Sequence, residues 1–418
     1  MDLEVVRESE TRFRSYVDAL SSVIGHADRK RPLEDYCVGL MGPSERKSVE
    51  PIAAVTAPGR TAAQHQSLLH FVGESNWSDE KVLAKVREMV LPAIERHGAI
   101  EAWIIDDTGF PKKGMHSVGV ASQYCGQLGR EGNCQVAVSL SVANHHASLP
   151  VAYRLYLPRE WTKDRKRCRK AAVPATVHFT TKQQIALAHI KAALAAGVPR
   201  GVVLIDADYG RDGNLRQELR SLELTYVAAI QSSPLAWRPG SGPKTDRRLP
   251  ITRREDPDLM SIKELALSLD ESTWKTIRWR EGSADWLESR FARVRARLAR
   301  EDEQWLLIEW PRDEKAPIKY WLSNLPEDIP FNELVDIAKL RWRIERDYQE
   351  LKQEVGLGHY EGRGWRGFHH HATLCIAAYG FLISERETIP PSGPRPAPLF
   401  SQLAVPDGHK SRGAAAAA

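Results

Sequence analysis

Two stretches of the sequence place acidic residues directly after an uninterrupted run of large apolar residues. Residues 103–105 lead into Asp106 and Asp107. Residues 202–205 lead into Asp206. Such runs are typical of strands buried on both faces, and ligands of open α/β sheets gather beyond the carboxyl ends of these strands. If the two strands are neighbours, we expect a cation between their carboxylates, because like charges oppose joint ionisation.

The expected cation is a divalent metal ion. No cluster of His or Cys lies near these aspartates, and carboxylate oxygens are the ligands that Mg²⁺ and Mn²⁺ prefer. Asp208 could add a further oxygen, or it could cap the helix that follows. The Asp-Asp-Thr-Gly sequence that begins at Asp106 could also simply form a turn.

A third acid comes from residues 336–357, whose apolar residues recur at helical spacing. Glu345 lies at the margin of this apolar stripe. Arg341 and Lys352, four and seven residues away, fall on nearly the same face of the expected helix. Alone, Glu345 would be interpreted as a salt-bridged surface residue. With the two aspartates it forms an Asp, Asp, Glu set that could hold two divalent ions for in-line phosphoryl transfer.

The elements that must position these residues predict an α/β fold with a mixed sheet. In chain order we expect an N-terminal helical, DNA-binding domain (1–98), the first part of the core (99–231), a β-rich insertion (232–328), core helices with Glu345 (329–388) and a Pro-rich disordered tail (389–418). From pattern alone, the N-terminal helices could equally be a plain packing domain. Seven of the twelve tryptophans fall in the insertion.

Three blocks of sequence, at 104–135, 204–210 and 340–371, resemble the DDE-type transposases of bacterial insertion sequences. The texts "DDTGFPKKG" and "GHYEGRGWRGFHHH" are most similar to the "IS seven-oh-one" family, which is related to the larger "IS-four" branch. The resemblance covers residues 30 to 385 as ordered blocks. It implies an RNase H-like core flanked by helices, with a β-rich insertion before the Glu helix.

The resemblance also assigns site residues by position. The second Asp of the triad falls on Asp206. The first falls on Asp107 if the Asp–Thr pair is aligned, or on Asp106 if it is counted from the strand end, and we favour Asp107 with Asp106 and Asp208 as alternates. The Glu falls on Glu345. These acids would bind two Mg²⁺ or Mn²⁺ ions.

The "IS-four" branch signature adds basic residues that hold DNA. Its Arg falls on Arg341 and its Lys on Lys352, but its Tyr falls on Ala338 and is missing, unless Tyr348 takes its place. In relatives, an aromatic residue of the insertion can take up a flipped base, but nothing in the sequence selects one of the tryptophans here.

Other basic residues could contact the DNA backbone. Lys112 and Lys113 follow the first Asp and could approach a phosphate or form a solvated loop. A denser basic segment comprises Arg165, Lys166, Arg167, Arg169 and Lys170. Such a run is usually a solvated surface, but in a phosphodiester enzyme it would add affinity rather than specificity.

Three adjacent histidines, His369, His370 and His371, could be interpreted as a metal site. Adjacent residues on one helix point in different directions and share an ion poorly. We therefore expect them near DNA or at a helix start.

Bulk properties exclude some classes of protein. The five cysteines lack zinc-site spacing, and no apolar run approaches the ~20 residues of a membrane span. The charged N-terminus does not resemble a signal peptide. We therefore expect a cytoplasmic protein with reduced thiols and no membrane partner. The resemblance to transposases of bacterial insertion sequences implies a bacterial, nucleoid-associated protein.

These observations predict a cut-and-paste transposase. It would cleave DNA at the terminal inverted repeats of its element and use the freed 3′-OH to attack target DNA. It would act as a dimer on DNA, and the sequence leaves open whether a hairpin forms. The alternatives are an RNase H-fold DNA nuclease without strand transfer and a domesticated DNA-binding regulator.

Overall fold

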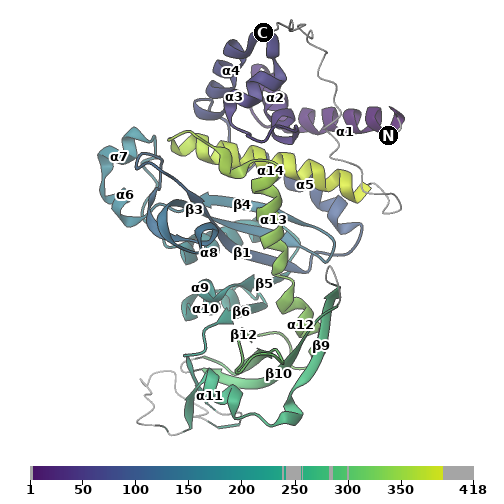
Figure 1. Cartoon of the computed structure of the whole chain (residues 1–418), viewed down its shortest axis with the longest axis vertical. Helices are drawn as coiled ribbons and strands as arrows, with labels where there is room; N and C mark the ends of the chain where they lie inside the picture. Colours follow the sequence, from purple (N-terminus) through teal and green to yellow (C-terminus); the bar gives the residue numbers. More distant parts are fainter. Residues whose placement is uncertain are drawn as a thin grey trace, which may run out of the picture.

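The computed structural model describes residues 3–237, 240–241, 256, 258–281, 286–298 and 301–388. Its strands form a 12-stranded mixed sheet flanked by helices, which confirms the predicted α/β class and is consistent with an RNase H-like core (Figure 1). The prediction of a disordered tail at 389–418 lies outside the described residues.

The strands have these bounds: β1 (Ala102–Pro111), β2 (Ala121–Cys125), β3 (Arg130–Ala143), β4 (Ser148–Leu155), β5 (Val202–Ile205), β6 (Tyr226–Ile230), β7 (Leu235–Trp237), β8 (Leu259–Ser261), β9 (Lys275–Glu281), β10 (Trp286–Leu298), β11 (Gln304–Trp310) and β12 (Lys319–Ser323).

The α-helices have these bounds: α1 (Leu3–Ser21), α2 (Lys30–Met41), α3 (Val49–Thr56), α4 (Thr61–Gly73), α5 (Asp79–Glu95), α6 (Arg159–Lys163), α7 (Arg165–Lys170), α8 (Lys182–Ala195), α9 (Ala207–Gly210), α10 (Gly213–Ser221), α11 (Ile262–Leu267), α12 (Phe331–Lys339), α13 (Trp342–Gln353) and α14 (Trp365–Thr388).

Strands β1 and β5, which carry the two acidic ends, are parallel neighbours, which meets the condition stated in the sequence analysis. Strand β3 pairs antiparallel with the other edge of β1, and β6 extends the sheet beyond β5 in parallel. The apolar residues 102–105 of β1 are fully buried, so burial fixes where the strand lies. The carboxyl ends of β1 and β5 therefore meet at one edge of the sheet.

The insertion extends the core sheet. Strand β12 pairs antiparallel with β6, and β11 and β10 follow in order. The outer part of the insertion has its own small apolar cluster, which includes Leu306, Ile308 and Leu322. In Figure 1 these strands form the end of the molecule opposite the N-terminal helices.

The N-terminal helices pack on α14, and one continuous apolar core links them to the sheet. Phe13 and Tyr16 of α1 contact the ring of Phe381 on α14, and the Tyr16 hydroxyl donates to the Ala377 carbonyl. None of the described helices has the length and apolar character that crossing a bilayer requires.

The helix expected over residues 336–357 is interrupted. Helix α12 ends at Lys339 and α13 begins at Trp342, and the turn between them holds Leu340 and Arg341. Neither Pro nor Gly lies at this turn. Leu340 is buried and Arg341 pairs with acids of the sheet, so tertiary contacts account for the break.

Candidate active site

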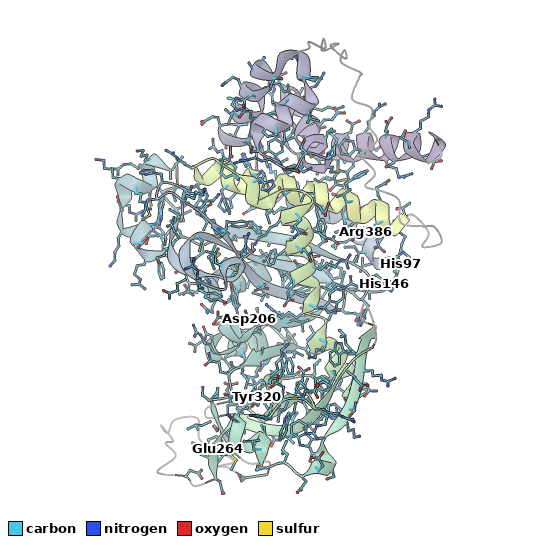
Figure 2. The ribbon with its side chains drawn as sticks, in the orientation of Figure 1. His97, His146, Asp206, Glu264, Tyr320 and Arg386 are labelled. Atoms are coloured by element: carbon cyan, nitrogen blue, oxygen red, sulfur yellow. The ribbon has the colours of Figure 1, made fainter. Side chains whose placement is uncertain are left out.

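The side chain of Arg341 brings together one acid from each of three elements. Its Nη2 lies 2.8 Å from Asp106 Oδ2 and 3.7 Å from Asp206 Oδ2. Its Nη1 lies 3.6 Å from Glu345 Oε1. The strand ends and the Glu helix therefore converge on one cation. Figure 2 labels Asp206 at the level where the core meets the β-rich end of the molecule.

Strand pairing directs Asp106 toward α13. Asp106 is paired with Ser139 of β3, and directly opposed residues of antiparallel strands share a face. The Ser139 hydroxyl lies 2.6 Å from the hydroxyl of Tyr348 on α13, and the Tyr348 hydroxyl also lies 3.4 Å from the Asp106 carbonyl oxygen. Asp106 therefore shares the face that α13 covers.

Asp107 points to the opposite face, because successive residues of a strand alternate. Its Oδ2 lies 2.7 Å from Lys182 Nζ at the start of α8 and 3.5 Å from the Tyr209 hydroxyl. Arg341 thus pairs with Asp106 and Asp206, whereas Asp107 pairs with Lys182, although its charge still acts on Asp206.

Asp206 is fixed by the first turn of α9. Its Oδ1 accepts hydrogen bonds from the backbone N–H groups of Asp208 and Tyr209. Its other carboxylate oxygen, Oδ2, lies 3.7 Å from Arg341 Nη2. Gly210 allows α9 to pack on β6, because a Cβ there would collide with the Ala229 carbonyl oxygen. Asp208, an alternate in the sequence prediction, is exposed on this turn.

Burial changes the protonation of the two pocket aspartates. It raises the pKa of Asp106 to about 7, although Arg341 opposes the shift. It also raises the pKa of Asp206, again against the effect of Arg341. Burial alone would lower the pKa of Arg341, but the nearby carboxylates outweigh it and raise the pKa. The single positive charge of Arg341 therefore does not offset the burial of the two carboxylates.

Glu345 differs from the two aspartates in exposure. Its side chain is 72% exposed, against 15% for Asp106 and 31% for Asp206. Within the described residues, no three His, Cys, Asp or Glu side chains already form a metal-binding group. The donor set of carboxylate oxygens around one cation nevertheless fits hard divalent ions.

Two of the predicted DNA-binding lysines support the end of β1. Lys352 Nζ donates to the Gly109 carbonyl at 3.1 Å, and Lys112 Nζ donates to the Tyr360 carbonyl at 2.9 Å. Burial lowers the pKa of both. Lys113, in contrast, is exposed.

The basic segment forms helix α7. Arg167 stacks on the Trp161 ring at 3.7 Å and donates to the Met115 carbonyl, so α7 is anchored beside the loop after β1. The other four basic residues, Arg165, Lys166, Arg169 and Lys170, are exposed.

The three histidines and Tyr348 are buried. The histidines lie near the start of α14, as one of the two expectations had it, and their ring nitrogens are within hydrogen-bonding distance of backbone groups, as at Leu155, Val72 and Gly356. Their burial does not favour the alternative expectation of a DNA contact. The Tyr348 hydroxyl is bonded to Ser139, and its replacement of the missing signature Tyr stays a prediction.

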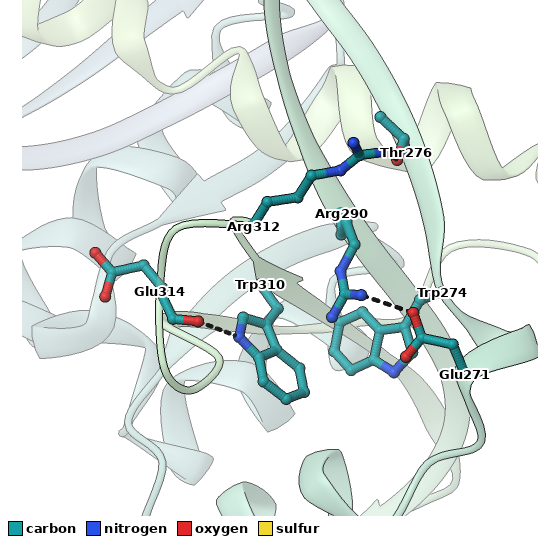
Figure 3. Close-up of a pocket in the computed structure, with 7 residues that line it drawn as sticks. All are labelled: Glu271, Trp274, Thr276, Arg290, Trp310, Arg312 and Glu314. Carbon is teal, nitrogen blue, oxygen red and sulfur yellow. Dashed lines mark hydrogen bonds and ion pairs between the residues drawn. The ribbon is translucent and has the colours of Figure 1, made fainter.

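The insertion contains a pocket of about 420 Å³ that sequence patterns did not identify (Figure 3). The rings of Trp274 and Trp310 meet edge to face at 5.3 Å, and the Arg290 guanidinium lies within 5.5 Å of both. Of the insertion tryptophans, Trp237, Trp305 and Trp321 are buried, and the side chain of Trp286 lies outside the described residues. Trp274, Trp279 and Trp310 are partly buried, and of these three only Trp274 and Trp310 line the pocket.

Comparisons with known proteins agree with this geometry. A sequence model of the family described as "DDE superfamily endonuclease" matches residues 19–285. A relative from Microchaete diplosiphon, the "Probable transposase for insertion sequence element IS701", is 32% identical over 197 residues. This match covers 47% of each chain, so the chain spans about half the length of that curated relative.

Proposed function

Because the chain belongs to the DDE superfamily of endonucleases, we propose that it is an insertion-sequence transposase. It would cleave DNA at the inverted repeats that bound its element and join the freed 3′-OH to target DNA. The observation that carries the proposal is the convergence of Asp106, Asp206 and Glu345 on Arg341. The name of the IS701 relative supports the same reaction.

We propose Asp106, Asp206 and Glu345 as the metal-binding acids. Asp106 shares a face with the Glu helix, which favours it over Asp107. Asp107 would position β1 through its ion pair with Lys182. The buried aspartates must lose their protons to act as ligands.

Endonucleases of this superfamily are metal-dependent, and we propose two Mg²⁺ or Mn²⁺ ions per site. When bound, they would supply an activated attacking oxygen and a stabilised leaving oxygen. The chain's own residues would orient the DNA strand. Exposed Lys113 and the basic face of α7 would contact backbone phosphates, while Lys352 and Lys112 hold the end of β1.

The tryptophan pocket offers a place for an unpaired base. The partly buried rings of Trp274 and Trp310 could stack on a base, and Arg290 and Arg312 could pair with a phosphate. The N-terminal helices would bind the inverted repeats, and a dimer would hold both ends together. The protein would work on DNA in the bacterial cytoplasm, associated with the nucleoid.

The test is a cleavage and joining assay on DNA taken from both flanks of the gene, with Mg²⁺. Asp206→Asn should abolish cleavage. Asp208→Asn, two residues away on the exposed turn, should retain it. Equal activity of Asp206→Asn and the unmodified protein would refute the catalytic assignment. Repeat binding without any cleavage by the unmodified protein would favour a regulator.

Pre-cut ends separate the transposase from a nuclease of the same fold. If pre-cut ends with a free 3′-OH are joined to a target plasmid, the transposase proposal holds. If ends are cut but never joined, the chain is a nuclease without strand transfer.

A further inference from the structure

The guanidinium of Arg341 occupies the space that the three acids enclose. Its Nη2 lies 2.8 Å from Asp106, and its approaches to the other two carboxylates are longer, at 3.6 and 3.7 Å. Its Nε is buried and has no hydrogen-bond partner among the described residues. The side chain is thus held by charge rather than by a saturated set of hydrogen bonds.

Other nearby cations are engaged elsewhere. Lys182 pairs with Asp107 on the opposite face, and Lys352 donates to a backbone carbonyl. In the part of the chain that the structure describes, Arg341 is therefore the cation paired with both pocket aspartates. A divalent ion that bound the same carboxylate oxygens would be repelled by it at very short range.

The position of Arg341 allows its side chain to move away from Asp106 and Asp206. It lies in the turn between α12 and α13 rather than within a helix, and its side chain is 22% exposed. The guanidinium matches the geometry of a phosphate and binds it through two parallel hydrogen bonds. A DNA phosphate near the exposed Glu345 would therefore offer Arg341 an alternative partner.

We propose that Arg341 is an exchangeable counter-ion that couples metal binding to DNA binding. Without DNA, its guanidinium neutralises Asp106 and Asp206 and weakens divalent ion binding. With DNA, the guanidinium moves to a backbone phosphate and the aspartates become available to the ions. This inference rests on the proposed function, because it takes the three acids as metal ligands. Linkage requires that divalent ions strengthen DNA binding by the same factor.

The test measures Mn²⁺ binding by electron paramagnetic resonance in the absence of DNA. Arg341→Gln should bind Mn²⁺ about 10- to 100-fold more tightly than the unmodified protein, in the range of typical coupling between sites. Arg346→Gln is the matched control, because Arg346 lies in the first turns of α13, just after Arg341, but pairs with Glu350. It should bind Mn²⁺ as the unmodified protein does. Equal or weaker binding by Arg341→Gln overturns the proposal.

Two additions separate the possible failures. The double variant Arg341→Gln/Asp206→Asn should lose Mn²⁺ binding; if it binds normally, or if no variant binds Mn²⁺, the proposed metal site itself is wrong. A saturating DNA duplex of arbitrary sequence should raise the Mn²⁺ affinity of the unmodified protein toward that of Arg341→Gln and leave the variant unchanged. If the duplex changes the Mn²⁺ affinity of neither protein, or changes both affinities by the same factor, the proposed exchange is refuted.

Thermal denaturation gives a readout that is independent of activity. Without metal, Arg341→Gln should unfold at a lower temperature than Arg341→Lys, which keeps the charge. Addition of Mn²⁺ should raise the unfolding temperature of Arg341→Gln more than that of the unmodified protein. An equal rise in both would count against competition.

Discussion

The buried histidines of α14 and the acidic pocket around Arg341 are both clusters of titratable groups, but their partners differ. The ring nitrogens of His371 lie 2.9 Å from the Tyr36 hydroxyl and 3.0 Å from the Gly356 carbonyl oxygen. Each nitrogen of that imidazole therefore has a fixed partner. In the pocket, Arg341 reaches two of its acids only at 3.6 Å or more, and its Nε has no partner among the described residues.

The difference separates polar groups that hold a fold from those that can exchange partners. Saturated hydrogen bonds to the backbone fix α14 against the N-terminal helices and the turn after α13, so removing one leaves a buried group unpaired. Long, charge-only contacts leave the pocket ready to accept other ligands. The predictions below test whether the two clusters differ in this way.

The largest expected effect separates the two adjacent aspartates of β1. Asp106→Asn should reduce DNA cleavage about 1,000-fold or more, because a metal-binding acid is lost. Asp107→Asn should stay within about tenfold, because its contribution is a half-exposed ion pair with Lys182. Single-turnover cleavage rates measure both. The opposite order would assign the first metal ligand to Asp107.

The next effect is on stability. His371→Leu should lower the free energy of unfolding by about 4 kcal/mol, because the Tyr36 hydroxyl and the Gly356 carbonyl lose their partner in the core. Denaturant titration measures this, with His371→Gln as the control that keeps part of the hydrogen bonding. The cleavage rate per folded molecule should not change. A loss of activity without a loss of stability would place His371 with the pocket.

A smaller effect concerns pH. Burial lowers the pKa of His371 to about 4, below its usual value of 6.5 in the unfolded chain. The unfolded state therefore binds the proton more tightly, so the stabilisation is complete above pH 6.5 and is lost as the pH falls toward 4. Between pH 7 and pH 4, the difference in unfolding free energy between the unmodified protein and His371→Gln should shrink by about 3 kcal/mol. A constant difference would mean that His371 has the same pKa in the folded and the unfolded chain.

The smallest expected effect concerns the pocket lined by Trp274 and Trp310. Trp310→Ala should weaken binding of a duplex with one unpaired base by about tenfold, and leave a fully paired duplex unaffected. Trp305→Ala, at a buried position of the same strand, should instead destabilise the protein. Fluorescence anisotropy measures binding. A Trp310 variant that is merely unstable would show that the pocket is structural.

Local patterns were enough to predict much of the fold and of the site. Apolar runs identified β1 and β5 as buried strands with acidic ends, and helical spacing identified the segment that carries Glu345. Both predictions depend on residues that are close together in the chain, because the periodicity of apolar residues indicates which face of a strand or helix is buried. The break at Leu340 and Arg341 has no such local signal, so it was missed.

The sequence by itself determined that acids end two buried strands, that a third lies on a helix, and that the class is α/β. Only the tertiary structure decided that Asp106 rather than Asp107 meets Arg341, that the histidines are buried, and which tryptophans line the pocket. A strand's alternation is local, but the face that meets α13 is set by long-range packing. Composition and spacing cannot resolve that choice, because either register satisfies the same local pattern.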